Sequence, residues 1–69
     1  MKKASEYRQH AEECRALAAQ MSSPAQRAQM LEMAEHWEKL ARDRAALISK
    51  HPELAIAGEQ EEEQRRPEA

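Results

Sequence analysis

Three neighbouring side chains near the start of the chain are of the types that bind metal ions. His10, Glu13 and Cys14 are three and four residues apart, so a helix would place His10 on a shared face with each of the other two. Histidine, cysteine and carboxylate side chains are the common ligands of zinc. His36, which follows Glu32 by four residues, is a fourth candidate ligand. These residues predict, as one alternative, a metal- or small-ligand-binding helical bundle.

The helices that must carry these side chains argue against a metal site within one chain. On a helical wheel Cys14 lies on an apolar stripe, where cysteine usually acts as a small buried hydrophobe. His10 lies at the edge of that stripe and His36 on the flank of a second helix, so the ligands would converge only across a dimer. The sequence has no glycine-rich phosphate loop, nucleophile elbow or zinc-finger spacing. It therefore predicts no enzyme, no catalytic residue and no cofactor.

The segment 30–48, with Trp37 at its centre, has the clearest helical pattern in the chain. Its apolar residues recur every three or four positions, and polar residues occupy the opposite face. The i, i+4 pair of Glu35 and Lys39 supports the helix further. Arg44 interrupts the apolar stripe, and we expect it to lie past the end of the neighbouring helix and extend its charge to water. The alternative is a buried pair with a carboxylate of another subunit.

The sequence predicts two helices joined by a very short connection. The first helix spans 5–21, with Ser5 as its N-cap and a seam of small and apolar residues: Tyr7, Ala11, Cys14, Ala18 and Met21. The second spans 24–50 and starts where Ser23 can cap it and Pro24 fits the first turn. Short connections make antiparallel neighbours. The fold class is therefore all-α, an antiparallel helical hairpin.

The chain divides into a hairpin, a connector and a charged tail. The hairpin occupies residues 1–50. Pro52 disfavours helix for the residue before it, so residues 51–58 form a helix stop and a short connector. Residues 59–69 contain no large apolar side chain and many charged ones. We therefore expect this tail to be disordered or loosely helical.

Size and composition indicate self-association. The chain has 69 residues, and its only aromatic side chains are Tyr7 and Trp37, so a single hairpin buries little apolar surface. Cys14 has no partner for a disulfide within the chain, which fits the reducing cytoplasm. Leu47 and Ile48 would project beyond the shorter first helix and need cover from the tail or a second chain. We expect a homodimer that forms a four-helix bundle.

Charge and hydropathy exclude some partners. The net charge of −2 argues against a dedicated nucleic-acid binder. No apolar run is long enough to cross a membrane, and the basic start of the chain is not followed by the apolar core of a signal peptide. The sequence favours a non-enzymatic scaffold that binds itself or another helical protein. The residues expected in its core or interface are Tyr7, Cys14, Leu17, Ala18, Met30, Met33, Trp37, Leu40, Ala41, Leu47 and Ile48.

Residues 7–41 carry a combined pattern, Y-R-x-x-A-E-E-C followed by L-x-M-A-x-x-W-x-x-L-A. The first part runs from Tyr7 to Cys14, and the second from Leu31 to Ala41. This pattern resembles a group of short hypothetical proteins of alphaproteobacteria, whose function is not established. The resemblance implies a bacterial, cytoplasmic helical protein. It implies no activity and supplies no catalytic residues, and the tail lies outside it.

Overall fold

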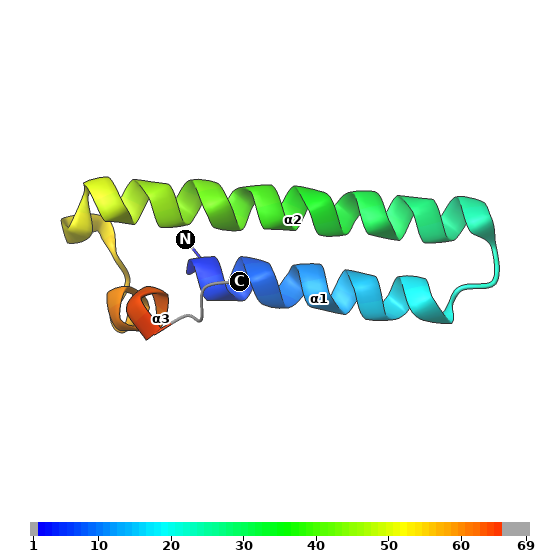
Figure 1. Ribbon diagram of the computed structural model, residues 1–69, viewed down its shortest axis with the longest axis horizontal. Coiled ribbons are helices and arrows are strands. Elements are labelled where there is room, and N and C mark those ends of the chain that lie inside the picture. The colour runs from blue at the N-terminus through cyan, green and yellow to red at the C-terminus, as the bar shows by residue number, and fades with distance from the viewer. Residues whose placement is uncertain (1, 66–69) are drawn as a thin grey trace.

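The computed structural model describes residues 2–65 as an all-helical chain (Figure 1). Helix α1 spans Ala4–Gln20 and helix α2 spans Pro24–Lys50. A single 3-10 turn, Pro52–Leu54, follows α2, and a short helix α3, Glu59–Arg65, ends the described chain. The sequence had predicted the first two helices within one residue of these bounds.

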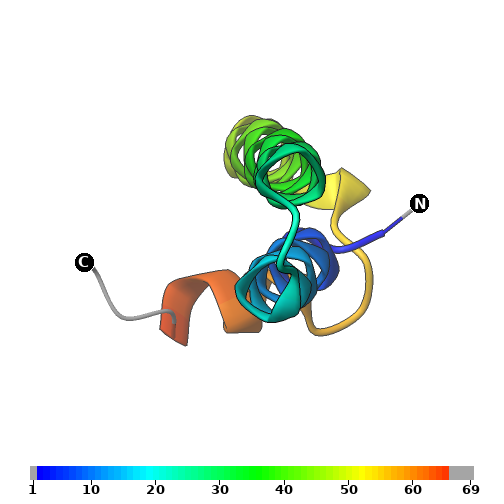
Figure 2. The ribbon, with the colours of Figure 1, turned by 90° about the vertical axis from the view of Figure 1, so that its right-hand side faces the viewer.

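Helices α1 and α2 form the predicted antiparallel hairpin (Figure 1), and the end-on view of Figure 2 shows them side by side. The turn between α1 and α2 has only three residues, because the last of them, Ser23, is already the N-cap of α2. The Ser23 hydroxyl accepts a hydrogen bond from the Gln26 amide, and Pro24 occupies the first helical position. Helix α1 has Lys3 at its N-cap instead of the expected Ser5. The Glu6 carboxylate accepts from the Lys3 amide, so the helix starts one residue earlier.

The core between α1 and α2 is built mainly from alanine. The apolar side chains that the structure buries are small, apart from one isoleucine: Ala4, Ala11, Cys14, Ala18, Ala34, Ala41 and Ile48. Met30 and Trp37 are partly buried and pack against the cluster of Ala11, Cys14 and Ala34. Small side chains let the two backbones approach closely, but each adds little apolar burial. The hairpin therefore depends on Trp37 and Met30 to close the edges of its core.

The tail differs from the sequence-based expectation. Residues 59–65 form helix α3, which contacts α1 near its N-terminus (Figures 1 and 2). Of the two expectations for the tail, disordered or loosely helical, these residues show a helix, and it is docked on the hairpin; residues 66–69 lie outside the described part of the chain. Both expectations considered only apolar burial, and α3 is held by carboxylates. Gly58, with φ of 84°, adopts the left-handed conformation that lets the chain turn into α3.

Candidate functional site

Trp37 is the centre of an aromatic cluster at the α1–α2 contact. The Tyr7 ring stacks on the indole at a centroid distance of 5.8 Å, and the His10 ring lies 4.7 Å from it. His36, next to Trp37 on α2, meets the indole edge-on at 6.2 Å. Aromatic pairs at these distances add modestly to the stability that burial provides. The cluster holds the half-buried indole in place while part of it still faces a shallow groove.

That groove belongs to an apolar face that no described residue covers. Met33, Leu40 and Leu47 recur at intervals of seven residues on α2 and so form one row along the helix. Met33 is 48% exposed and Leu47 is 37% exposed. Leu17 on α1 is 48% exposed and follows His10 by seven residues, which places it on the Trp37 side of the hairpin. The groove itself is lined by Gln29, Glu32, Met33, His36 and Trp37.

We call the row of Met33, Leu40 and Leu47, together with Leu17, the apolar face. Of the residues expected in a core or interface, the structure buries Cys14, Ala18, Ala41 and Ile48. It leaves the members of the apolar face exposed or half-buried. Ile48 is 4% exposed, and it lines a small pocket together with Gln60 and Glu63 of α3.

The metal-ligand candidates are only partly brought together. His10 Nδ1 lies 3.4 Å from Glu13 Oε1, and both side chains are exposed. Cys14 is 7% exposed and packs in the alanine core, in a cluster with Ala11 and Ala34. His36 is on α2, beside the indole. Within residues 2–65 no group of three or more His, Cys, Asp or Glu side chains is placed to hold a metal ion.

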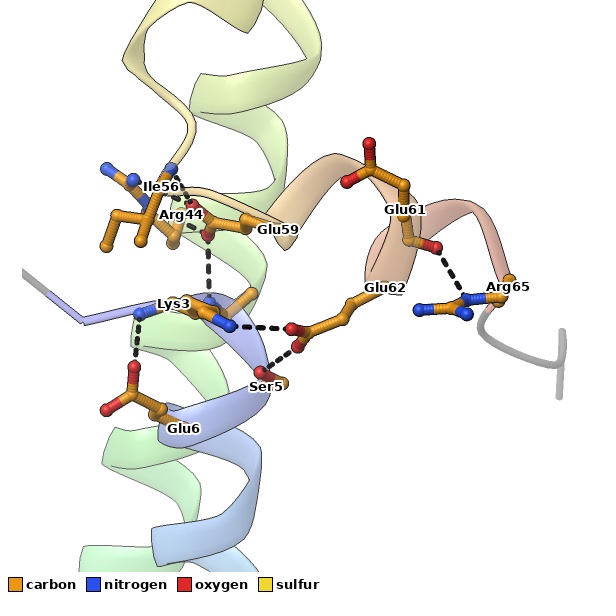
Figure 3. A network of polar contacts seen from close by, with 10 residues as sticks. Lys3, Ser5, Glu6, Arg44, Ile56, Glu59, Glu61, Glu62 and Arg65 are labelled. Atoms are coloured by element: carbon orange, nitrogen blue, oxygen red, sulfur yellow. Dashed lines mark hydrogen bonds and ion pairs between the residues drawn. The ribbon is translucent and has the colours of Figure 1, made fainter.

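A second constellation, which the sequence analysis missed, lies where α3 meets the hairpin. Arg44 donates from Nε to Oε2 of Glu59 at 3.0 Å and from Nη2 to Oε1 at 2.8 Å (Figure 3). The backbone amide of Ala4 donates to Oε2 at 3.1 Å, and that of Ile56 donates to Oε1 at 3.0 Å. The Leu54 carbonyl accepts from Arg44 Nη2 at 3.0 Å. Each carboxylate oxygen of Glu59 therefore accepts two hydrogen bonds.

Both members of this pair are buried. Arg44 is 5% exposed and Glu59 is 0% exposed. The hydrogen bonds from Arg44, assisted by the amides of Ile56 and Ala4, lower the pKa of Glu59 to about 2, although burial opposes the shift. The hydrogen bond to Glu59 likewise raises the pKa of Arg44. The ion pair is therefore charged throughout the physiological pH range.

Two further ion pairs flank it on the same side of α3. Lys3 Nζ and Ser5 Oγ donate to the two carboxylate oxygens of Glu62, at 2.7 Å and 2.6 Å (Figure 3). This contact raises the pKa of Lys3 and lowers that of Glu62. Arg8 donates to Glu63. Because the three glutamates stand at i, i+3 and i+4, one face of α3 presents all three carboxylates. We call the pairs Arg44–Glu59, Lys3–Glu62 and Arg8–Glu63 the C-terminal clasp.

The clasp corrects the expectation for Arg44. Its charge does not reach water, and the carboxylate that it meets belongs to the same chain, so neither alternative drawn from the sequence describes the structure. Two signals could have indicated the pair. An arginine in the middle of an apolar stripe needs a carboxylate if it is buried. The run that starts at Glu59, directly after Gly58, offers carboxylates at helical spacing.

The fold and site define an all-helical antiparallel hairpin with a C-terminal helix docked by ion pairs. No family model, no curated protein and no solved structure matches the chain. The resemblance of residues 7–41 to short alphaproteobacterial proteins therefore remains a prediction. Among the described residues, none of the helices combines the length and the apolar character that a membrane span requires.

Proposed function

We propose that this chain is a small, non-enzymatic helical interaction module that acts as a homodimer, in which two hairpins pack through their apolar faces into a four-helix bundle. The observation that carries the proposal is the row of Met33, Leu40 and Leu47, beside Trp37 and Leu17, left uncovered along one side of the hairpin. Apolar side chains gathered in this way mark a contact surface more often than a free one.

The exposed area supports a partner of the same size. The chain is a rod of 44 × 19 × 18 Å and exposes 5163 Å². A compact monomer of 7.9 kDa is expected to expose about 4,400 Å². The excess of about 750 Å² is close to the roughly 800 Å² that each partner buries in a standard interface.

The distribution of charge supports a second copy as that partner. The ion pair between Arg15 and Glu38, at 2.5 Å, lies away from the apolar face on the helical wheel. Arg44 lies on the same side of α2 as Leu40 and Leu47, but its charge is already paired with Glu59. A twofold axis would place identical apolar faces against each other, so the bundle could close without burying an unpaired charge. The lone thiol of Cys14, buried in the core, fits a reducing compartment, and we place the module in the cytoplasm.

A metal- or small-ligand-binding bundle is the second candidate. Its supporting observation is that His10 and His36 lie beside Trp37 and Glu13 lies beside His10, so a dimer would bring two sets of these side chains together. Cys14 is no longer a suitable ligand, because it is buried among alanines. Elemental analysis of untagged protein separates the candidates: stoichiometric metal would favour this one.

The dimer is tested by sedimentation equilibrium at low micromolar concentration. We expect twice the chain mass of 7.9 kDa. Met33→Glu should return the mass to that of one chain while preserving helical content, because it places a charge in the apolar face. Leu31→Glu is the matched control: Leu31 is 43% exposed but lies two residues from Met33, on the opposite side of α2. A folded wild-type monomer, or equal effects of the two variants, would overturn the proposal.

A further inference from the structure

We propose that α3 exchanges between the two copies of the dimer, so that the C-terminal clasp also forms between subunits. The inference rests on the proposed homodimer. Its starting observation is that α3 is held by polar contacts: its sequence, EQEEEQR, contains no apolar residue. Glu59, Glu62 and Glu63 supply the contacts, and all of their partners on the hairpin are donors.

The docked state of α3 is less favourable than its number of ion pairs suggests. Arg8 Nε, Arg44 Nη1 and Glu63 Oε2 are buried without a hydrogen-bond partner among the described residues. A buried polar group without a partner loses its hydration and gains nothing in return. Helix α3 has seven residues and is too short to be stable by itself. The docking of α3 is therefore reversible, and α3 forms a helix on any hairpin that presents Arg44, Lys3 and Arg8 to its three glutamates.

The segment that would move carries its own internal structure. The Ile56 amide donates to the Glu59 carboxylate, and the Glu59 amide donates to the Ile56 carbonyl at 2.8 Å. These two bonds would move together with the tail. The hairpin of the second copy would therefore need to supply only Arg44, the Ala4 amide and the side-chain donors that contact Glu62 and Glu63. Because both bonds span Gly58, the moving segment starts at Ile56, and the hinge is Ala55, which follows the 3-10 turn in an extended conformation.

A second copy is the occupant that the geometry fits best. The clasp requires carboxylates at i, i+3 and i+4 of a helix, and α3 of another copy offers that arrangement atom for atom. Exchange re-forms the same bonds, so it changes the energy little. Once the apolar faces have brought two hairpins together, the tail of the partner is present at high local concentration. No acidic segment of another protein has that advantage.

The test uses two full-length charge-reversal variants, Arg44→Glu and Glu59→Arg. Within either chain the reversed residue meets a like charge, so each variant alone should lose the clasp and melt at lower temperature. In a mixed dimer with exchanged tails, residue 44 of each chain meets residue 59 of the other chain. Both contacts then join opposite charges again. We expect an equimolar mixture to melt well above either variant, and native mass spectrometry with one chain isotope-labelled to show the mixed dimer in more than the statistical half.

The double variant Arg44→Glu/Glu59→Arg in one chain is the control for folding, because it restores opposite charges without exchange. If the reversed pair does not fold in this buried setting, Arg8→Glu and Glu63→Arg provide the same test at the more exposed pair. A mixture that melts like its separate components, while the control variant folds and the wild type is dimeric, would overturn the exchange and leave the dimer standing. A monomeric wild type would overturn both.

Discussion

The substitution Glu59→Gln separates the charge of the clasp from its shape. Glutamine has the size of glutamate and keeps one carbonyl acceptor, but it leaves the guanidinium of Arg44 buried without an anion. Removing one partner of a buried pair destabilises a protein strongly because the remaining charge is uncompensated. We expect α3 to undock in this variant and the hairpin to remain helical. Glu61→Gln is the matched control, since Glu61 is an exposed residue of the same helix.

The size and pH dependence of the effect follow from the pKa of Glu59. A fall from 4.5 in the unfolded chain to about 2 in the folded one corresponds to at most about 3 kcal/mol. Because the folded-state pKa is the lower one, this stability is fully present above about pH 4.5. It is lost as the pH falls toward about 2. The free energies of unfolding of wild type and Glu59→Gln should therefore differ at pH 7 and converge near pH 2.

Urea unfolding followed by Trp37 fluorescence measures the global free energy, and amide hydrogen exchange measures the docking of α3. Since α3 can undock while the hairpin stays folded, part of the effect should appear only in the exchange of its amides. A difference between wild type and variant that stays constant from pH 7 to pH 2 would refute the assignment of the stability to the ionised carboxylate. Equal losses for Glu61→Gln would refute the special role of Glu59.

The remaining predictions concern the hairpin itself. Trp37→Ala should lower the free energy of unfolding by about 2–3 kcal/mol if the indole stays half-buried, and by about 3–5 kcal/mol if a dimer covers it; urea titrations at two protein concentrations distinguish these values. Arg15→Ala should cost less than about 1 kcal/mol in the same assay, because the Arg15–Glu38 pair is largely exposed. Cys14→Ser should be more damaging than Cys14→Ala, since it places a hydroxyl in the alanine core.

The hairpin could be predicted from the sequence because its determinants are local. The cap at Ser23, the proline after it and the stop before Pro52 mark the ends of α2, and the observed helix starts and ends where they indicate. The antiparallel arrangement also followed, since a short turn forces residues of α1 and α2 to pair in reverse order. Tyr7 beside Trp37 is one result.

The clasp could not be predicted in the same way because its determinants are distant in sequence. Arg44 and Glu59 are fifteen residues apart, and Ala4 and Glu59 are fifty-five apart. Periodicity identifies which residues share a face of one helix, but it does not pair a buried cation with a remote carboxylate. An argument from apolar burial alone therefore left the tail unplaced, although three of its charged side chains hold it to the hairpin.

Lys3, Ser5, Glu59 and Glu62 meet toward the end of the rod away from the α1–α2 turn, so their contacts join α3 to the start of α1 there. A dye or affinity handle attached close to Lys3 or Glu62 would disturb these contacts. The turn around Ser22 is exposed and lies at the far end of the rod (Figure 1). It is the position from which a reporter can watch the molecule without disturbing it.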